Sequence, residues 1–182
     1  MKHLYYLVAQ LPAFSVNSDN TAKLPISTEY FRDLCMRFMD EKDSDVVRNL
    51  SLEPPRESKA TGSAFLDTWY TKERNLRLAL AQLRALKMHK DTKDLPQVSD
   101  GEVIQAARTA TGMDSPLSAE QYLNEYRLGL LDKITPVDMF SVDAVYCYGL
   151  KLMLTERMKK FNRDEGLASY HKIYDEILGE TK

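Results

Sequence analysis

The feature that most restricts the fold of this chain is a long run with helical periodicity between Gly62 and His89. Its large apolar residues recur at the spacing of one face of an α-helix. They are Phe65, Trp69, Leu76, Leu80, Leu83 and Met88. The interior contains neither Gly nor Pro, the residues least compatible with a helix. We therefore predict a helix from about Ser63 to His89, the longest of the chain.

Composition extends this prediction to the whole chain. The 182 residues include only seven Gly and seven Pro, and most of the Pro residues separate periodic segments. This pattern favours helices over a turn-rich β fold. Apolar residues make up 43% of the chain, which is enough for a folded core of this size. We predict an all-α fold, with one bundle-like domain of about six to seven helices over residues 1–182.

Apolar periodicity and capping residues place the other helices. We predict them at about 28–39, 46–50, 100–110, 118–131 and 164–178, with one more from Thr135-Pro136 to a break that begins near Asn162. Ser27 or Thr28 is the expected N-cap of the first. Ser118 and Gln121 form a capping box for the helix at 118–131. The charged segment 40–45 is interpreted as a break.

Two segments are left open by the sequence. Residues 3–10 are apolar and fit either a short buried helix or a strand. Residues 51–62 contain Pro54-Pro55, which excludes the interior of a helix or strand. We predict an exposed loop at about 51–62, serving either as an ordered contact or as a flexible tether.

Charge argues against nucleic acid and anionic membrane as partners, because the net charge is only −2. The distribution is uneven: residues 72–90 are mainly basic and residues 94–125 are mainly acidic. These runs are either solvated helix faces that compensate each other or a basic face for an acidic protein partner.

The longest apolar run, Leu4 to Ala9, is far short of the ~20 residues of a membrane span. We expect a cytoplasmic protein.

Motifs for catalysis, cofactors and metals are not found. The chain lacks a glycine-rich phosphate loop, and it also lacks Cys-x-x-Cys and His-x-x-x-His. Cys35 and Cys147 lie on apolar faces and are interpreted as buried thiols in a reducing compartment. His171 and Asp175 lie one turn apart and are either a surface pair or a shared ligand. We predict no enzymatic activity and no cofactor.

Aromatic residues are interpreted as structural. Tyr122 and Tyr126, like Tyr170 and Tyr174, are paired four residues apart. Their neighbours are mixed or acidic, whereas a stacking surface for nucleic acid would contain interleaved basic residues. We expect these rings at seams between helices, with the hydroxyl at the edge.

Partner-binding residues are predicted among the cations of two helices. They are Arg74, Arg77 and Arg84 on the long helix, and Lys151, Arg157, Lys159 and Lys160 in the segment from Phe140 to Gly166. The alternative for the arginines is that they cover the apolar stripe and pair with an acidic helix.

Three segments carry a resemblance to a known family. They are YYLVAQLP at the start, WYTKERNLRLALAQLRA from Trp69, and FSVDAVYCYGLKLMLTERMKKFNRDEG from Phe140 to Gly166. Together they resemble a bacterial family of unknown function encoded in V/A-type ATPase operons. That family is similar to a shortened form of the central-stalk component C of these ATPases, which is component d in eukaryotes. This component is an all-helical funnel that sits on the membrane rotor ring and receives the rotating shaft.

The resemblance implies a non-catalytic helical subunit or accessory factor of a V/A-type ATPase. Its partners would be the rotor shaft or the membrane ring, and it would be peripheral on the cytoplasmic face of the membrane. It would couple, assemble or regulate an ion-transporting complex. The alternatives are an unrelated helical adaptor that binds a peptide or helix, and an enzyme with a site that its motifs do not reveal.

Overall fold

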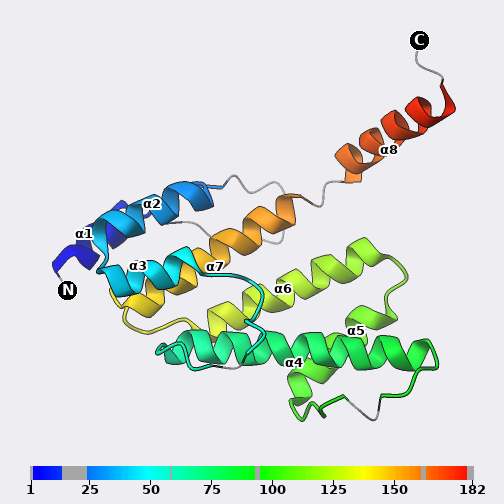
Figure 1. Ribbon diagram of the computed structural model, residues 1–182, viewed down its shortest axis with the longest axis horizontal. Coiled ribbons are helices and arrows are strands. Elements are labelled where there is room, and N and C mark those ends of the chain that lie inside the picture. Colours follow the sequence, from blue (N-terminus) through cyan, green and yellow to red (C-terminus); the bar gives the residue numbers. More distant parts are fainter. Residues whose placement is uncertain (1, 14–23, 58, 93–94, 161–162, 180–182) are drawn as a thin grey trace.

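The computed structural model describes residues 2–13, 24–57, 59–92, 95–160 and 163–179. Within these residues the chain forms eight α-helices and no strand, which confirms the all-α prediction (Figure 1). The helices are α1 (Lys2–Gln10), α2 (Thr28–Phe38), α3 (Glu41–Arg48), α4 (Ala64–Lys87), α5 (Gly101–Gly112), α6 (Pro116–Ile134), α7 (Val142–Lys159) and α8 (Arg163–Leu178). The expected number of six to seven is too low, because the apolar pattern of α1 fits a helix and a strand equally well.

Local capping explains where most helices begin. Ser27, Ser63, Asp100, Ser115 and Ser141 are the N-caps of α2, α4, α5, α6 and α7. Each of these side chains accepts a hydrogen bond from the backbone N–H three residues later. Such a bond satisfies an N–H group that has no partner inside the helix.

Three predicted boundaries were wrong. The helix around 46–50 begins earlier, at Glu41, so most of the supposed break at 40–45 is helical. Glu41 and Asp43 lie in its first turn, where acidic side chains interact favourably with the helix dipole. The helix at 118–131 begins at Pro116, which occupies the first helical position, where a proline is well tolerated.

The third wrong boundary is the start of α7. Thr135 ends α6 and donates a hydrogen bond from its hydroxyl to the carbonyl of Leu131, at 2.6 Å. Pro136 disfavours helical backbone at the residue before it, so α6 ends there and a loop follows. The helix then begins at Val142, after the N-cap Ser141.

Two apolar clusters form the core. The larger one contains Leu7, Phe31, Trp69 and Leu150 and joins α1, α2, α3, α6 and α7 to the first half of α4. The smaller one joins the second half of α4 to α5 and the first half of α6, and it is rich in alanine. The helices α4 and α6 pass through both clusters and connect them.

The helix α7 is central to this arrangement. It packs against α2, α3, α4 and α6, and α1 packs on α2 at one end of the molecule (Figure 1). The helix α8 follows α7 and projects beyond this body. The arrangement therefore consists of a packed helical body and one helix that stands apart from it.

The connection between α3 and α4 has defined contacts at the residues described, 51–57 and 59–62. Arg74 donates a hydrogen bond to the carbonyl of Pro55 at 2.7 Å, and Arg77 Nη1 lies 3.4 Å from Glu53 Oε1. Near α4, the backbone N–H of Thr61 donates to Asp67 Oδ1 at 2.8 Å. These contacts favour an ordered segment over a free tether.

Candidate functional site

The polar residues of α7 connect it to distant parts of the chain. At its start, Ser63 donates a hydrogen bond from Oγ to Asp143 Oδ1 at 2.6 Å, so the N-cap of α4 is tied to α7. One turn on, the hydroxyl of Tyr148 donates to the carbonyl of Pro12 at 3.0 Å. Burial raises the pKa of Tyr148 to about 12, so this hydroxyl stays protonated and able to donate.

The second half of α7 makes two further connections. Thr28 donates a hydrogen bond from its hydroxyl to Glu156, which joins α7 to the start of α2. Arg157 Nη2 donates to Glu120 Oε1 at 2.5 Å, which joins α7 to α6. These four polar residues of α7, Asp143, Tyr148, Glu156 and Arg157, therefore position it within the body.

A buried charged cluster lies where the two apolar clusters meet. Glu73 of α4 is 2% exposed, and Arg127 of α6 is 5% exposed. Arg127 donates from Nε to Oε2 of Glu73 at 2.9 Å and from Nη2 to Oε1 at 3.0 Å. Arg77 donates from Nε to Oε1 of the same carboxylate at 2.9 Å. Such bidentate, charge-assisted geometry offsets part of the large cost of burying the charges.

Most of the predicted partner-binding cations have internal partners. Arg77 contacts Glu73 and Glu53, and Arg157 contacts Glu120. Arg74 donates to the carbonyl of Pro55. On α7, Lys151 Nζ lies 2.7 Å from Asp132 Oδ1 and also donates to the hydroxyl of Thr135. These four cations hold elements of the body together.

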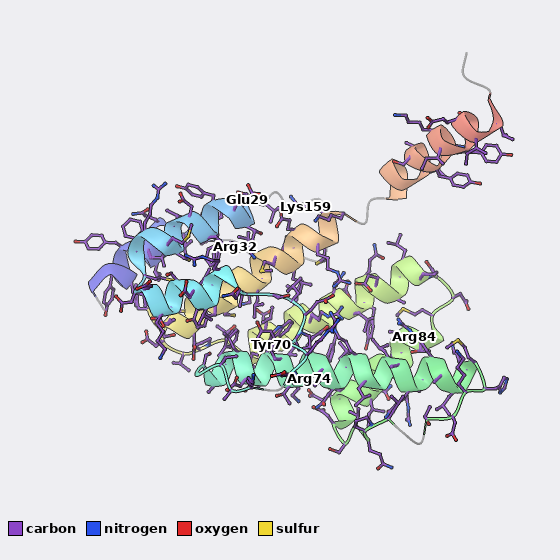
Figure 2. All side chains as sticks on the ribbon, viewed as in Figure 1. Glu29, Arg32, Tyr70, Arg74, Arg84 and Lys159 are labelled. Carbon is purple, nitrogen blue, oxygen red and sulfur yellow. The ribbon has the colours of Figure 1, made fainter. Side chains whose placement is uncertain are left out.

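The three remaining cations are Arg84, Lys159 and Lys160. Lys159 is half-buried, and Arg84 and Lys160 are exposed. Figure 2 shows Arg84 on α4 and Lys159 at the end of α7, on separate parts of the body. The structure therefore does not bring the predicted cations together into one continuous basic surface.

Some side chains of the basic run on α4 also contact the segment that contains the acidic run. Lys72 Nζ lies 2.5 Å from Asp100 Oδ2, and this hydrogen bond lowers the pKa of Asp100. Lys87 donates from Nζ to the carbonyl of Thr111 on α5. Part of the basic charge is thus compensated inside the chain.

A cavity of about 470 Å³ lies between α3, the α3–α4 connection and the start of α4. Val46, Pro55, Leu66 and Tyr70 give it apolar walls, and Asp45 and Glu53 lie among its polar lining. Figure 2 shows Tyr70 and Arg74 on this half of α4. The volume falls in the range of small-molecule sites. Among the described residues that line it there is no histidine, cysteine or lysine, and its carboxylates are those of Asp45 and Glu53.

Both cysteines are buried, as the sequence predicted. Burial raises the pKa of the Cys35 thiol to about 12 and also raises that of Cys147. A thiol in this state is a poor nucleophile and metal ligand. Within the described part of the chain, no group of three or more His, Cys, Asp and Glu residues could hold a metal ion.

The apolar face of α8 is uncovered. Every residue described from 166 to 179 is exposed. The large apolar side chains of this helix are Leu167, Tyr170, Ile173, Tyr174, Ile177 and Leu178, which we call the α8 stripe. The rings of Tyr170 and Tyr174 stack on each other at 5.9 Å, but neither lies in a seam between helices of the body, contrary to our expectation.

A second exposed apolar group lies at the α1 end of the body. The ring of Tyr5 lies 4.7 Å from the ring of Phe140, and both are exposed. Val137 and Met139 are exposed in the same connection between α6 and α7, and Tyr6 is exposed on α1. This group is made of side chains from separate elements, whereas the α8 stripe runs along one helix.

Sequence reasoning missed two of these features. Glu73 and Arg127 are 54 positions apart, and no local signal connects them. The α8 stripe can be recognised from the periodicity of the sequence. A helix whose stripe packs against its own body has the same periodicity. Only the position of α8 distinguishes the two cases.

Searches among protein-family models, curated proteins and solved structures found no match to this chain. Among the described helices, none has both the length and the apolar character needed to cross a membrane. What the geometry defines is an all-α body with one uncovered amphipathic helix.

Proposed function

We propose that this chain is a non-catalytic helical subunit or accessory factor of a V/A-type ATPase, which couples or assembles the rotor stalk and the membrane ring. The observation that carries the proposal is the α8 stripe, a row of six exposed apolar side chains on a helix that stands apart from the body. A protein surface would remove these side chains from water.

The identity of the complex comes from the resemblance of three segments to the ATPase-operon family. Those segments correspond to α1, to α4 and to the region from α7 into α8. The polar residues of the third segment join α7 to α2, α4 and α6. A rigid central helix of this kind suits a part that transmits force or holds subunits in register. The protein would act from the cytoplasmic face of the membrane, without a cofactor.

The experiment is to delete the gene in its native cell and to measure the ATPase complex. We expect fewer intact complexes, or complexes that hydrolyse ATP while ATP-driven ion transport into membrane vesicles falls. An epitope-tagged copy should restore both and should co-purify with proteins of the rotor shaft and ring. Normal assembly and normal coupled transport in the deletion strain would contradict the proposal.

A second candidate is an adaptor for an unrelated helical or peptide partner. The cavity beside α3 favours it, because apolar walls with a few polar groups suit a peptide side chain. The tagged protein would then recover a defined partner without any rotor or stalk protein. The same purification therefore separates the two candidates.

A further inference from the structure

The α8 stripe has the dimensions of a docking helix. The 16 residues of α8 extend for roughly 24 Å at the usual helical rise. At 100° per residue, the six large apolar side chains of the stripe share one side of the helix. Each of them is at least 49% exposed. A single helix of this kind buries its stripe well in a groove that has two walls, which is a common mode of helix recognition.

The charges beside the stripe indicate which side chains the rims of such a groove should carry. Asp175 and Glu176 are exposed, and helical geometry places them on opposite flanks of the stripe. Lys172 is also exposed and lies on the side opposite the stripe. A partner would therefore meet apolar side chains in the middle and carboxylates on both edges. Basic residues on both walls of the groove would complement these carboxylates.

An anionic lipid surface is a poorer occupant. Amphipathic helices that lie on such membranes carry lysine and arginine on their polar face. The sequence of α8 contains two basic residues against four acidic ones, so it carries a net negative charge. The negative potential of the membrane would repel it.

A second copy of α8 is also a poorer occupant. The stripe covers about two heptads, whereas a coiled coil needs roughly three to four. A contact between two such short helices also has difficulty reaching the ~1,000 Å² expected of a specific interface. Asp175 and Glu176 are exposed near the C-terminal end of α8. A parallel pair would therefore bring these like charges together.

We propose that α8 docks into an apolar groove between two helices of a different protein, and that lysine or arginine residues line both rims of that groove. This inference rests on the proposed function, because it takes the partner to be a stalk or ring protein of the ATPase. The Tyr170 and Tyr174 rings fill the groove, and Asp175 and Glu176 pair with its rims. Aromatic side chains that become fully buried commonly dominate the affinity of such contacts.

The test uses full-length protein and ATPase complexes purified from a strain that lacks this gene. The stripe variant combines Tyr170→Asp and Tyr174→Asp, and the flank variant combines Asp175→Lys and Glu176→Lys. Lys172→Gln is the matched control on the opposite side of α8. All three change exposed side chains, so circular dichroism and the melting temperature of the body should remain at wild-type values.

We expect the stripe variant to bind at least about 30-fold more weakly than wild type, because it removes two anchors. The flank variant should bind about tenfold more weakly and lose most of the salt dependence of binding. The control should stay within about twofold of wild type.

The outcomes separate this inference from the proposed function. If wild-type protein does not bind the complexes, the ATPase role fails and the inference fails with it. If wild type binds and the stripe variant binds equally well, only the docking role of α8 is overturned. Unchanged binding by the flank variant would overturn the basic rim. A wild-type dimer lost in the stripe variant, or α8-dependent binding to anionic vesicles, would overturn the choice of partner.

Discussion

At the scale of single residues, Glu73 is the most deeply buried charged group among the residues that the structure describes. Its position on α4 lies between Tyr70, which belongs to the larger apolar cluster, and Leu76, which belongs to the smaller one. Arg127 occupies the equivalent place on α6, between Leu123 and Leu128. The pair therefore marks the boundary between the clusters on both helices that cross it.

Removing one member of this pair should be costly. We expect Glu73→Ala to lower the free energy of unfolding by about 3–5 kcal/mol, because it leaves Arg127 buried without its carboxylate. Urea unfolding measures this change. Replacing both residues, as Glu73→Leu with Arg127→Met, should recover much of the loss, since neither charge then remains buried.

An exposed ion pair provides the matched control for this prediction. Lys59 Nζ lies 2.5 Å from Glu57 Oε2, but both side chains are more than 70% exposed. Glu57→Ala should change stability by less than about 1 kcal/mol. If Glu73→Ala were as mild as this control, the buried pair would not have the structural role assigned to it.

At the scale of elements, α7 approaches its neighbours closely at Gly149. A Cβ atom at this position would lie 2.7 Å from Phe31 Cε1 and 2.9 Å from Leu50 Cδ2. Both distances are shorter than a normal van der Waals contact. The glycine therefore allows Phe31 of α2 and Leu50, just after α3, to pack directly against the backbone of α7.

Two glycine substitutions test this packing. Gly149→Ala should lower the free energy of unfolding by about 1–3 kcal/mol, because the methyl group overpacks the contact with Phe31. Gly129→Ala, in the exposed middle of α6, meets no atom within 4 Å and should raise stability by up to about 1 kcal/mol. Chemical denaturation of the two variants gives the comparison. If Gly149→Ala also raised the free energy of unfolding, α7 would have more space around this position than the structure indicates.

At the scale of the whole molecule, stability should be unevenly distributed. The larger cluster contains Trp69, Phe31 and several leucines, whereas alanines make up half of the smaller cluster. Less apolar area is therefore buried around α5 than around α7. The helix α8 has no buried residue among those described, and 16 residues is near the lower limit for an isolated helix in water.

Native-state hydrogen exchange should reveal this order directly. We expect amide protection to be highest in α7, lower in α5 and lowest in α8, because each element opens with its own free energy. Mass spectrometry of peptides from each helix, at two protein concentrations, measures the order. Protection of α8 equal to that of α7 in a monomer would contradict the uncovered helix. Protection that appears only at high concentration would indicate self-association.

Much of the fold could be predicted from the sequence because its signals are local. A helix is recognised from side chains that repeat along one face and from a cap such as Ser27 or Ser63 that bonds to a backbone group three residues away. The errors arose where two local signals competed. Thr135-Pro136 fits both the end of one helix and the start of another, and Ser141 provided the better cap.

The sequence by itself determined that the chain is all-α, which residues form apolar stripes, and that both cysteines lie on apolar faces. Only the tertiary structure decided which stripes are covered. The stripe of α7 is buried in the body and the stripe of α8 is exposed, although both have the same period. Likewise, Glu73 and Arg127 meet only because α4 and α6 pack side by side. Helix formation depends on neighbours a few residues away, whereas burial and ion pairing depend on which distant surfaces come into contact.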